Sequence, residues 1–208
     1  MGRKQVWGRD EVLASAMSLF RRRGYLGASL RDLEEATGMH PGSLYRAFHS
    51  KEGLFAAALD AYNERVVEER VRVHLRDAQD PVAGIRSFFT SAFDNGIGSE
   101  PDPGCLLTNT AVESFTVPQA TPGVRRGLET IESGFSDALT RARSQRLLPP
   151  DLDVEESAAQ LLALYQGLLV LVRSGTGAAK LRTITDGALA SIGAGQATAK
   201  QANEEEQR

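Results

Sequence analysis

The chain has 208 residues, of which 41% are hydrophobic and 25% charged, and its formal net charge is −3. This composition suits one soluble domain, or a small domain joined to a larger one, with a substantial core. The net charge argues against a generally basic, nucleic-acid-coating surface. Residues 1–60 nevertheless carry +2 and the remaining residues −5, which fits a protein that presents one end to phosphate.

The most apolar stretch, residues 158–172, is interrupted by Gln160, Gln166 and Gly167, so we expect no membrane-spanning helix. The basic residues near the N-terminus are followed by no apolar segment, so we expect no signal peptide. The single cysteine excludes an internal disulfide framework and agrees with a reducing cytoplasm. These features predict a cytoplasmic protein.

Residues 1–9 have the composition of an N-terminal arm, and a first helix is predicted from about Asp10 to Arg23. Acidic residues suit the positive start of this helix and basic residues its negative end. Gly24 is a natural stop. The predicted buried stripe consists of Leu13, Ala16, Met17 and Phe20.

Ser29 is predicted to cap a second helix, with Asp32 completing an imperfect capping box, and this helix should end near Gly38. A third helix should begin at His40 and Pro41, because proline suits the first helical position. Two short helices joined by a turn that contains glycine form the helix-turn-helix pattern.

The third helix has two distinct faces. Leu44 and Phe48 stand four residues apart, so they share one face and can anchor the helix to a core. A guanidinium, a phenol and an imidazole beside a glycine make the other face suitable for contacting the major groove of DNA. That face contains Gly42, Tyr45, Arg46 and His49.

Ser50 is predicted to cap a fourth helix that runs to about Leu75. Lys51 stands at its positive end, where a cation opposes the helix dipole unless a phosphate binds there. We therefore interpret Lys51 as a phosphate contact, against the alternative of a tolerated surface lysine.

Further helices are predicted at 82–93, 105–115, 124–139, 153–173 and 177–192, with loops at 94–104 and 118–123. The helix at 153–173 is apolar nearly all round and needs cover on several sides. Paired with the helix at 177–192 against a second copy of the chain, it would form a four-helix homodimer interface. The alternative is a helix buried within one chain.

No stretch shows the alternation of a strand, so the predicted fold is all-α with about nine helices. We predict a three-helix head in residues 1–50, a larger helical body in 51–193 and a disordered tail in 194–208. His40, His49 and His74 form no metal or catalytic pattern, and the glycine pairs lack a nucleotide-binding fingerprint. We therefore predict no enzyme and no cofactor.

The segment from Asp10 to Tyr62, about a quarter of the chain, resembles the TetR family of bacterial transcriptional regulators. The resemblance implies a dimer with a three-helix DNA-binding head and a larger helical body that binds a small-molecule effector. His40 and Pro41 depart from the residues that many relatives have there. The match lies in Phe20, Gly24, Tyr25, Ser29, Leu30, Asp32, Leu33, Gly38, Gly42, Leu44, Tyr45, Phe48, Lys51, Glu52 and Leu54.

The resemblance also implies roles for particular residues. Phosphate contacts are implied for Ser29, Arg31, Tyr45 and Lys51, and base approach for Pro41, Gly42 and Arg46. His40 is predicted to lie beside DNA as well.

Residues 104–111 resemble the start of the corresponding helix in a TetR subset where a cysteine recurs, and some related regulators sense oxidants or electrophiles there. Cys105 is thus either a thiol switch or a small buried hydrophobic residue. Our main hypothesis is a repressor that leaves a pseudo-palindromic DNA operator when a small molecule binds its body. The candidate effector-binding residues are Phe88, Phe89, Phe93, Cys105, Asn109, Phe115, Tyr165 and Gln166.

Overall fold

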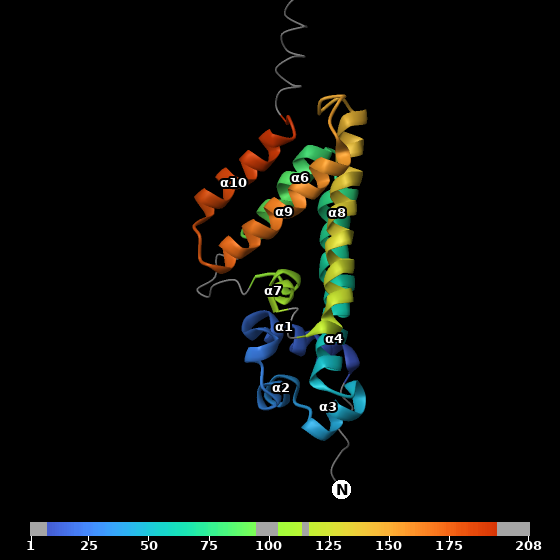
Figure 1. The fold of residues 1–208 in the computed structure, drawn as a ribbon, viewed down its shortest axis with the longest axis vertical. Helices are drawn as coiled ribbons and strands as arrows, with labels where there is room; N and C mark the ends of the chain where they lie inside the picture. Colours follow the sequence, from blue (N-terminus) through green and yellow to red (C-terminus); the bar gives the residue numbers. More distant parts are fainter. Residues whose placement is uncertain (1–7, 95–103, 114–116, 195–208) are drawn as a thin grey trace, which may run out of the picture. The chain divides into compact units, whose positions relative to one another are not determined.

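The computed structural model describes residues 8–94, 104–113 and 117–194. These residues form helices and no β-strand, which confirms the predicted all-α fold (Figure 1). They make nine continuous helical runs when adjoining elements are counted together, the number expected from the sequence. The elements are α1 (Arg9–Gly27), α2 (Leu30–Thr37), α3 (Pro41–Phe48), α4 (Lys51–Tyr62), η1 (Asn63–Val67), α5 (Glu68–Arg70), η2 (Val71–Arg76), α6 (Pro81–Thr90), α7 (Leu106–Glu113), η3 (Pro118–Ala120), α8 (Thr121–Ser144), α9 (Val154–Arg173) and α10 (Ala178–Ser191).

The chain divides into two compact units. The first consists of Met1–Val66 and Pro103–Gly127, and so holds α1 to α4, α7 and the start of α8. The second consists of Val67–Asp102 and Leu128–Arg208, and holds α5, α6, the rest of α8, α9 and α10. Within the described residues, no helix is both long enough and apolar enough for a membrane span.

The first unit is built on the packing of α1 against α4. Phe20 of α1 meets Phe55 of α4 edge to face, with ring centroids 4.7 Å apart, and Tyr25 lies 5.1 Å from the same ring. Phe20 and Phe55 are almost completely buried. Such aromatic pairs add to the free energy gained by burying their area, so they stabilise the packing of α1 on α4.

Gly24 interrupts α1 but does not end it. Its φ of 70° and ψ of 179° lie outside the helical region, and one further turn follows as far as Gly27. The predicted end at Arg23 is therefore short by one turn. The stripe predicted for α1 contains three buried residues, while Met17 is half-buried and Val12 and Leu19 are buried as well.

The run from Lys51 to Arg76 is helical over the predicted range, but it is not α-helical throughout. Residues 63–67 and 71–76 form π-helical turns, and the N–H of Asp77 bonds to the carbonyl of Arg72, five residues back. Val71 and Leu75 are buried at a spacing of four. This apolar spacing predicts the buried face but does not distinguish α-helical from π-helical hydrogen bonds.

The core of the second unit is an aromatic cluster contributed by α6, α8 and α9. Phe88 lies 5.2 Å from Phe135 and 4.8 Å from Tyr165, and Phe89 lies 5.3 Å from Tyr165. All four rings are buried. Gly134 lets α8 approach η2 closely, because a Cβ on Gly134 would stand 2.7 Å from Val71 Cγ1.

Boundaries of later helices also differ from the predicted ones, and α8 continues past the predicted end at 139 to Ser144. Residues 121–123 already belong to α8, because Pro122 is compatible with the first turn of a helix. Only Pro118–Ala120 form a separate 3₁₀ turn. Phe93 lies beyond the end of α6 at Thr90. Residues 1–7 of the predicted arm, the loop at 95–103, Phe115 and nearly all of the predicted tail lie outside the described residues, whereas Arg9, predicted in the arm, begins α1.

Candidate nucleic-acid interface

The candidate interface centres on α3. Leu44 and Phe48 are buried, as their spacing predicted, and they anchor α3 in the core of the first unit. The opposite face is exposed, and Tyr45 keeps 44% of its surface accessible. No atom of the described part of the chain lies within 4 Å of the position that a Cβ on Gly42 would occupy. The exposed residues of this face are Gly42, Tyr45, Arg46 and His49, the set predicted from the sequence.

Local hydrogen bonds set both ends of α3. Pro41 occupies the first turn, and the N–H groups of Ser43 and Leu44 bond to the carbonyl of His40. At the other end His49 has a φ of 67° and donates its N–H to the carbonyl of Tyr45. Histidine is among the residues that adopt this left-handed region more readily. The helix therefore ends abruptly and presents a short, two-turn surface.

The start of α2 is a complete capping box, not an imperfect one. The Asp32 N–H donates to Ser29 Oγ at 3.1 Å, while the Ser29 N–H and Oγ–H donate to the Asp32 carboxylate. These bonds from Ser29, together with the Arg23 ion pair, lower the pKa of Asp32 to about 2. The Ser29 hydroxyl is thus engaged within the chain, whereas Arg31 is exposed.

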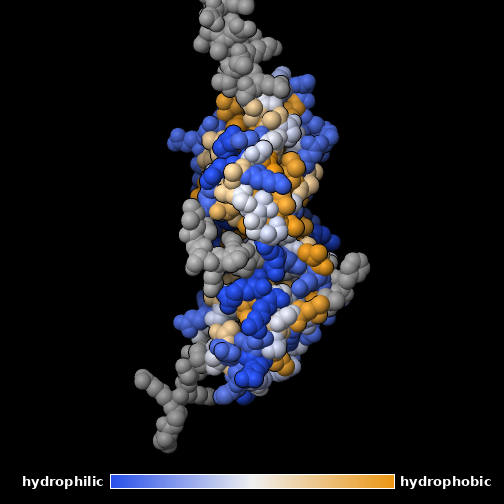
Figure 2. All heavy atoms as spheres, turned by 90° about the vertical axis from the view of Figure 1, so that its left-hand side faces the viewer, coloured by the Kyte–Doolittle hydropathy of each residue, from blue (hydrophilic) through white to orange (hydrophobic). Residues whose placement is uncertain are grey.

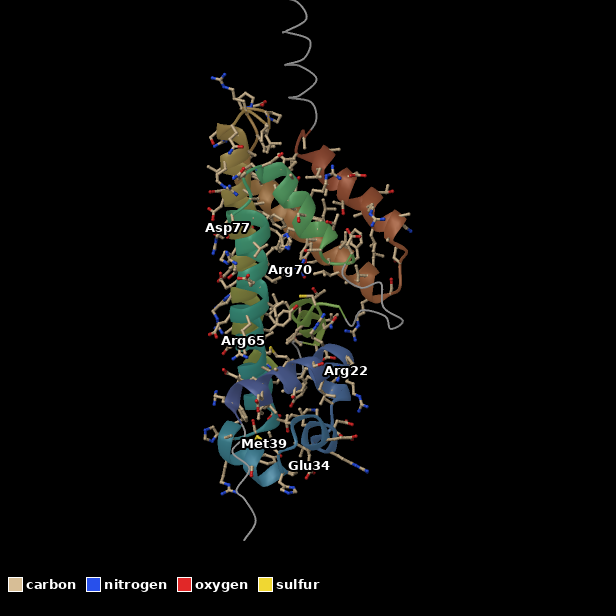
Figure 3. All side chains as sticks on the ribbon, turned by 180° about the vertical axis from the view of Figure 1, so that it is seen from behind. Arg22, Glu34, Met39, Arg65, Arg70 and Asp77 are labelled. Atoms are coloured by element: carbon tan, nitrogen blue, oxygen red, sulfur yellow. The ribbon has the colours of Figure 1, made fainter. Side chains whose placement is uncertain are left out.

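The turn between α2 and α3 carries the predicted glycine and one histidine. Gly38 caps α2 with a φ of 68° and donates its N–H to the carbonyl of Glu34. His40 Nδ1 lies 2.8 Å from Glu34 Oε1, on a side chain that is 90% exposed. Figure 3 labels Glu34 and Met39 in this region.

Lys51 takes a different position from the exposed one expected. Its ammonium donates to the carbonyl of Tyr25 at 2.6 Å and lies 4.2 Å from the centre of the Tyr25 ring. The Tyr25 hydroxyl in turn donates to Glu52 at 2.6 Å. Burial lowers the pKa of Lys51, while burial and Glu52 raise that of Tyr25 to about 12. A phosphate contact by Lys51 stays a prediction, and it requires the ammonium to leave this internal contact.

Two contributors to this region were not predicted. Arg9 lies 5.1 Å from the centre of the Phe48 ring and so covers the buried end of α3. Glu113 of α7 accepts from the Tyr25 N–H at 2.7 Å, directly after the break in α1. Glu113 is 88 residues away in sequence, so no local pattern could have predicted this contact.

The predicted effector-binding residues fall into both units. Phe88, Phe89 and Tyr165 belong to the buried aromatic cluster of the second unit, where half-buried Gln166 follows Tyr165. Phe93 is half-buried, with the Arg182 guanidinium 6.0 Å from its ring centre.

The other two described candidates belong to the first unit. Cys105 is buried and accepts a hydrogen bond from the Tyr62 hydroxyl at 3.5 Å. Asn109 donates to the carbonyl of Arg21 at 3.3 Å. Across the described ranges, no group of three acidic, histidine or cysteine side chains is arranged to hold a metal ion.

The α9–α10 face of the second unit carries apolar side chains that are exposed among the described residues. Leu164 and Val170 are 39% and 54% exposed. An open groove of about 720 Å³ runs between the two helices, lined by residues such as Ala163, Gly167, Leu171 and Ile184. Figure 2 views the molecule from the side of α10 and shows apolar residues among hydrophilic ones on this face.

Two short helices joined by a glycine turn, with the second anchored on one face and exposed on the other, define a helix-turn-helix DNA-binding protein. Two family models match the chain. "Bacterial regulatory proteins, tetR family" matches residues 12–58, and "Tetracyclin repressor-like, C-terminal domain" matches residues 81–188. The second match spans more than half of the chain, which therefore belongs to the TetR family of bacterial regulators.

Individual relatives agree with this assignment. The HTH-type transcriptional repressor ComR of Escherichia coli K12 is 29% identical over 187 residues, which cover 88% of each chain. A cysteine mutant of the regulator CifR, solved with 26-bp double-strand operator DNA, is 30% identical with a TM-score of 0.78, covering 92% of this chain and all of that one. The reduced form of E. coli NemR shares the fold with a TM-score of 0.76 at 21% identity, covering 88% of this chain and 94% of that one.

Proposed function

We propose that the chain is a dimeric repressor that binds a pseudo-palindromic operator through α3 and leaves it when a small molecule binds the second unit. The observation that carries the DNA-binding part is α3 itself. Its apolar residues are used for anchoring, while Tyr45 and Arg46 stand on an uncovered face beside Gly42. The same function is supported by two relatives: ComR is a transcriptional repressor, and the CifR mutant was solved in complex with operator DNA.

The dimer is proposed to form through α9 and α10. Exposed Leu164 and Val170 beside an open apolar groove are a surface that a second copy would remove from water. Two copies related by a two-fold axis would present their α3 helices to half-sites about 34–36 Å apart. Since the proposed target is a bacterial operator, we expect the protein to act in the cytoplasm.

The effector is proposed to release the protein from DNA by shifting the populations of two protein conformations. A ligand favours release only if it binds the released conformation more tightly than the DNA-bound one. The predicted effector residues Phe88, Phe89 and Tyr165 offer an apolar environment, with half-buried Gln166 as a polar neighbour.

The proposed DNA binding is tested by fluorescence anisotropy at several salt concentrations, with DNA from the region upstream of the gene that encodes this protein. Arg46→Ala should weaken binding and reduce the salt slope by about 1 if the guanidinium contacts phosphate, or relax base preference if it contacts a base. Tyr45→Phe should weaken binding without changing the salt slope, because only a neutral hydroxyl is removed. Arg86→Ala is the matched control, since Arg86 pairs with Asp186 in the second unit. If the control and both α3 variants bind equally well, α3 does not contact DNA.

A second candidate is a thiol-based sensor that uses Cys105. The observation that favours it is the Tyr62 hydroxyl, which donates to the Cys105 sulfur at 3.5 Å and so links the thiol to α4. Operator release by hydrogen peroxide should then be lost in Cys105→Ser and weakened in Tyr62→Phe. Release that is unchanged in Cys105→Ser would exclude this candidate and leave the small-molecule repressor intact.

A further inference from the structure

Arg70 differs from the other arginines of its helical run. Arg65, Arg72 and Arg76 are each paired with a carboxylate on the surface. The Arg70 guanidinium pairs with no carboxylate of the described residues, and its Nη2 donates instead to the Phe88 carbonyl at 3.1 Å and to Ser91 Oγ at 2.8 Å. Arg70 is therefore a half-buried cation bonded only to neutral acceptors.

The surroundings of this guanidinium are mostly aromatic. Its central carbon lies 5.1 Å from the centre of the Phe88 ring and 5.8 Å from that of Tyr165. Figure 3 shows Arg70 on the side of its helix that faces α6, whereas Asp77 lies on the opposite side. Rings attract a cation through their faces, but they provide no negative charge. Among the described residues of the second unit, the charge of Arg70 is therefore only partly compensated.

One donor of Arg70 has no acceptor. The Nε atom is buried and forms no hydrogen bond within the described part of the chain. A buried, unpaired donor on a charged group costs more free energy than a neutral one, and most such groups in folded proteins find a partner. The adjacent Nε–H and Nη–H edge of a guanidinium matches the two oxygens of a carboxylate.

His74, the nearest polar residue on the same helix face as Arg70, supplies no negative charge. His74, one turn after Arg70, contacts Ser87 Oγ through Nδ1 at 2.8 Å, and its ring lies 6.4 Å from Phe88. Burial and the charge of Arg70 lower the pKa of His74, which disfavours its charged form. Two π-helical turns, η1 and η2, flank α5, which carries Arg70. Such turns are frequent at functional sites.

We propose that Arg70 is the anion-recognising residue of the effector site, and that the effector is an organic carboxylate with an aromatic or otherwise apolar body. One carboxylate oxygen accepts from the Nε–H of Arg70, while Nη2 keeps its bonds to the Phe88 carbonyl and Ser91, and the apolar body packs against Phe88 and Tyr165. The Ser91 hydroxyl, which accepts from Nη2, and the Phe88 carbonyl orient the guanidinium. This assignment rests on the proposed function, because it names the ligand class of the same effector site.

Isothermal titration of the full-length protein tests the assignment with benzoate, phenylacetate and naphthoate, each compared with its neutral carboxamide. The wild-type protein should bind at least one carboxylate more tightly than its carboxamide. Arg70→Met keeps the apolar stem but removes the charge, and it should weaken carboxylate binding about 10- to 100-fold without affecting the carboxamide. Arg72→Met is the matched control, since Arg72 is exposed and paired with Glu69 and Asp77, and it should keep the carboxylate preference.

Arg70→Lys is a second variant, for the case that Arg70→Met does not fold. It keeps a charge but lacks the planar fork, so it should lose affinity for the carboxylate and not for the carboxamide. The assignment is overturned if no carboxylate binds better than its carboxamide, if the Arg70 variants keep the preference, or if Arg72→Met loses it equally. Operator binding without any of these compounds is measured in parallel. If the wild-type protein does not bind the operator, the proposed function is contradicted. If it binds the operator but does not prefer carboxylates, only the assignment of Arg70 is contradicted.

Discussion

Replacing Gly24 with alanine tests the contact between α1 and α7. Gly24 has a φ of 70° and a ψ of 179°, a backbone conformation that is essentially restricted to glycine. A Cβ at this position would overlap Oε1 of Glu113. The other oxygen of the same carboxylate accepts the Tyr25 N–H at 2.7 Å. The substitution therefore strains the backbone and displaces a hydrogen-bond acceptor at the same time.

The two effects have separate magnitudes. Holding a non-glycine residue in this region costs about 1–3 kcal/mol. Displacing the carboxylate leaves the half-buried Tyr25 N–H without its acceptor, which costs about 1–3 kcal/mol more. We therefore expect Gly24→Ala to lower the free energy of unfolding by about 2–6 kcal/mol.

Urea unfolding followed by far-UV circular dichroism measures this loss, at one fixed protein concentration because the proposed dimer couples stability to concentration. A double-mutant cycle with Glu113→Ala separates the two effects. Without the carboxylate, Gly24→Ala should cost only the backbone part, about 1–3 kcal/mol, so the two substitutions should be non-additive.

Gly42→Ala is the matched control, because a Cβ there meets nothing within 4 Å in a regular helix. The explanation fails if Gly24→Ala is no more destabilising than this control. It also fails in part if the cost of Gly24→Ala is the same with and without Glu113, since the carboxylate would then contribute nothing.

Three further substitutions, at Gly42, Ser29 and His74, have predicted effects on stability or binding. Gly42→Ala should raise the free energy of unfolding by up to about 1 kcal/mol in urea yet weaken operator binding in anisotropy, and unchanged affinity would show that the backbone does not approach DNA there. Ser29→Ala should cost about 1 kcal/mol by removing the cap of α2, and a cost near zero would mean that the reciprocal bonds with Asp32 do not stabilise the helix. Because the pKa of His74 is lowered below 6.5 in the folded state, the unfolded chain binds more protons as the pH falls through that value, and stability decreases. Thermal unfolding of His74→Gln should depend less on pH than that of the wild type between about pH 5 and 7, and equal slopes would contradict this assignment.

The arrangement of the DNA-binding head could be predicted in detail because it depends on short-range rules. The spacing of Leu44 and Phe48 determines which face of α3 is buried, and that face determines that Tyr45 is exposed. Ser29 and Asp32 form their capping box within four residues. The resemblance to the TetR family could be recognised from the same segment, since its motif lies within one continuous stretch.

Other parts of the predicted sites could not be decided in this way. The helix dipole predicts the environment of Lys51 from its own helix alone, but the ammonium lies against Tyr25, 26 residues earlier. Residue type predicts an effector site at the aromatic residues of α6, and in the structure Phe88 and Phe89 pack against Phe135 and Tyr165. Residue type alone cannot distinguish a packed core from the wall of a binding site.

The sequence by itself determined the all-helical fold, the helix-turn-helix and the faces of its helices, because these depend on periodicity and on hydrogen bonds between near neighbours. Only the tertiary structure decided that Gly24 meets Glu113, that Lys51 is engaged with Tyr25 and that Arg70 lacks a carboxylate partner within the described residues. These contacts join residues brought together by helix packing. Their charges and donors find partners, or fail to find them, only once that packing has formed.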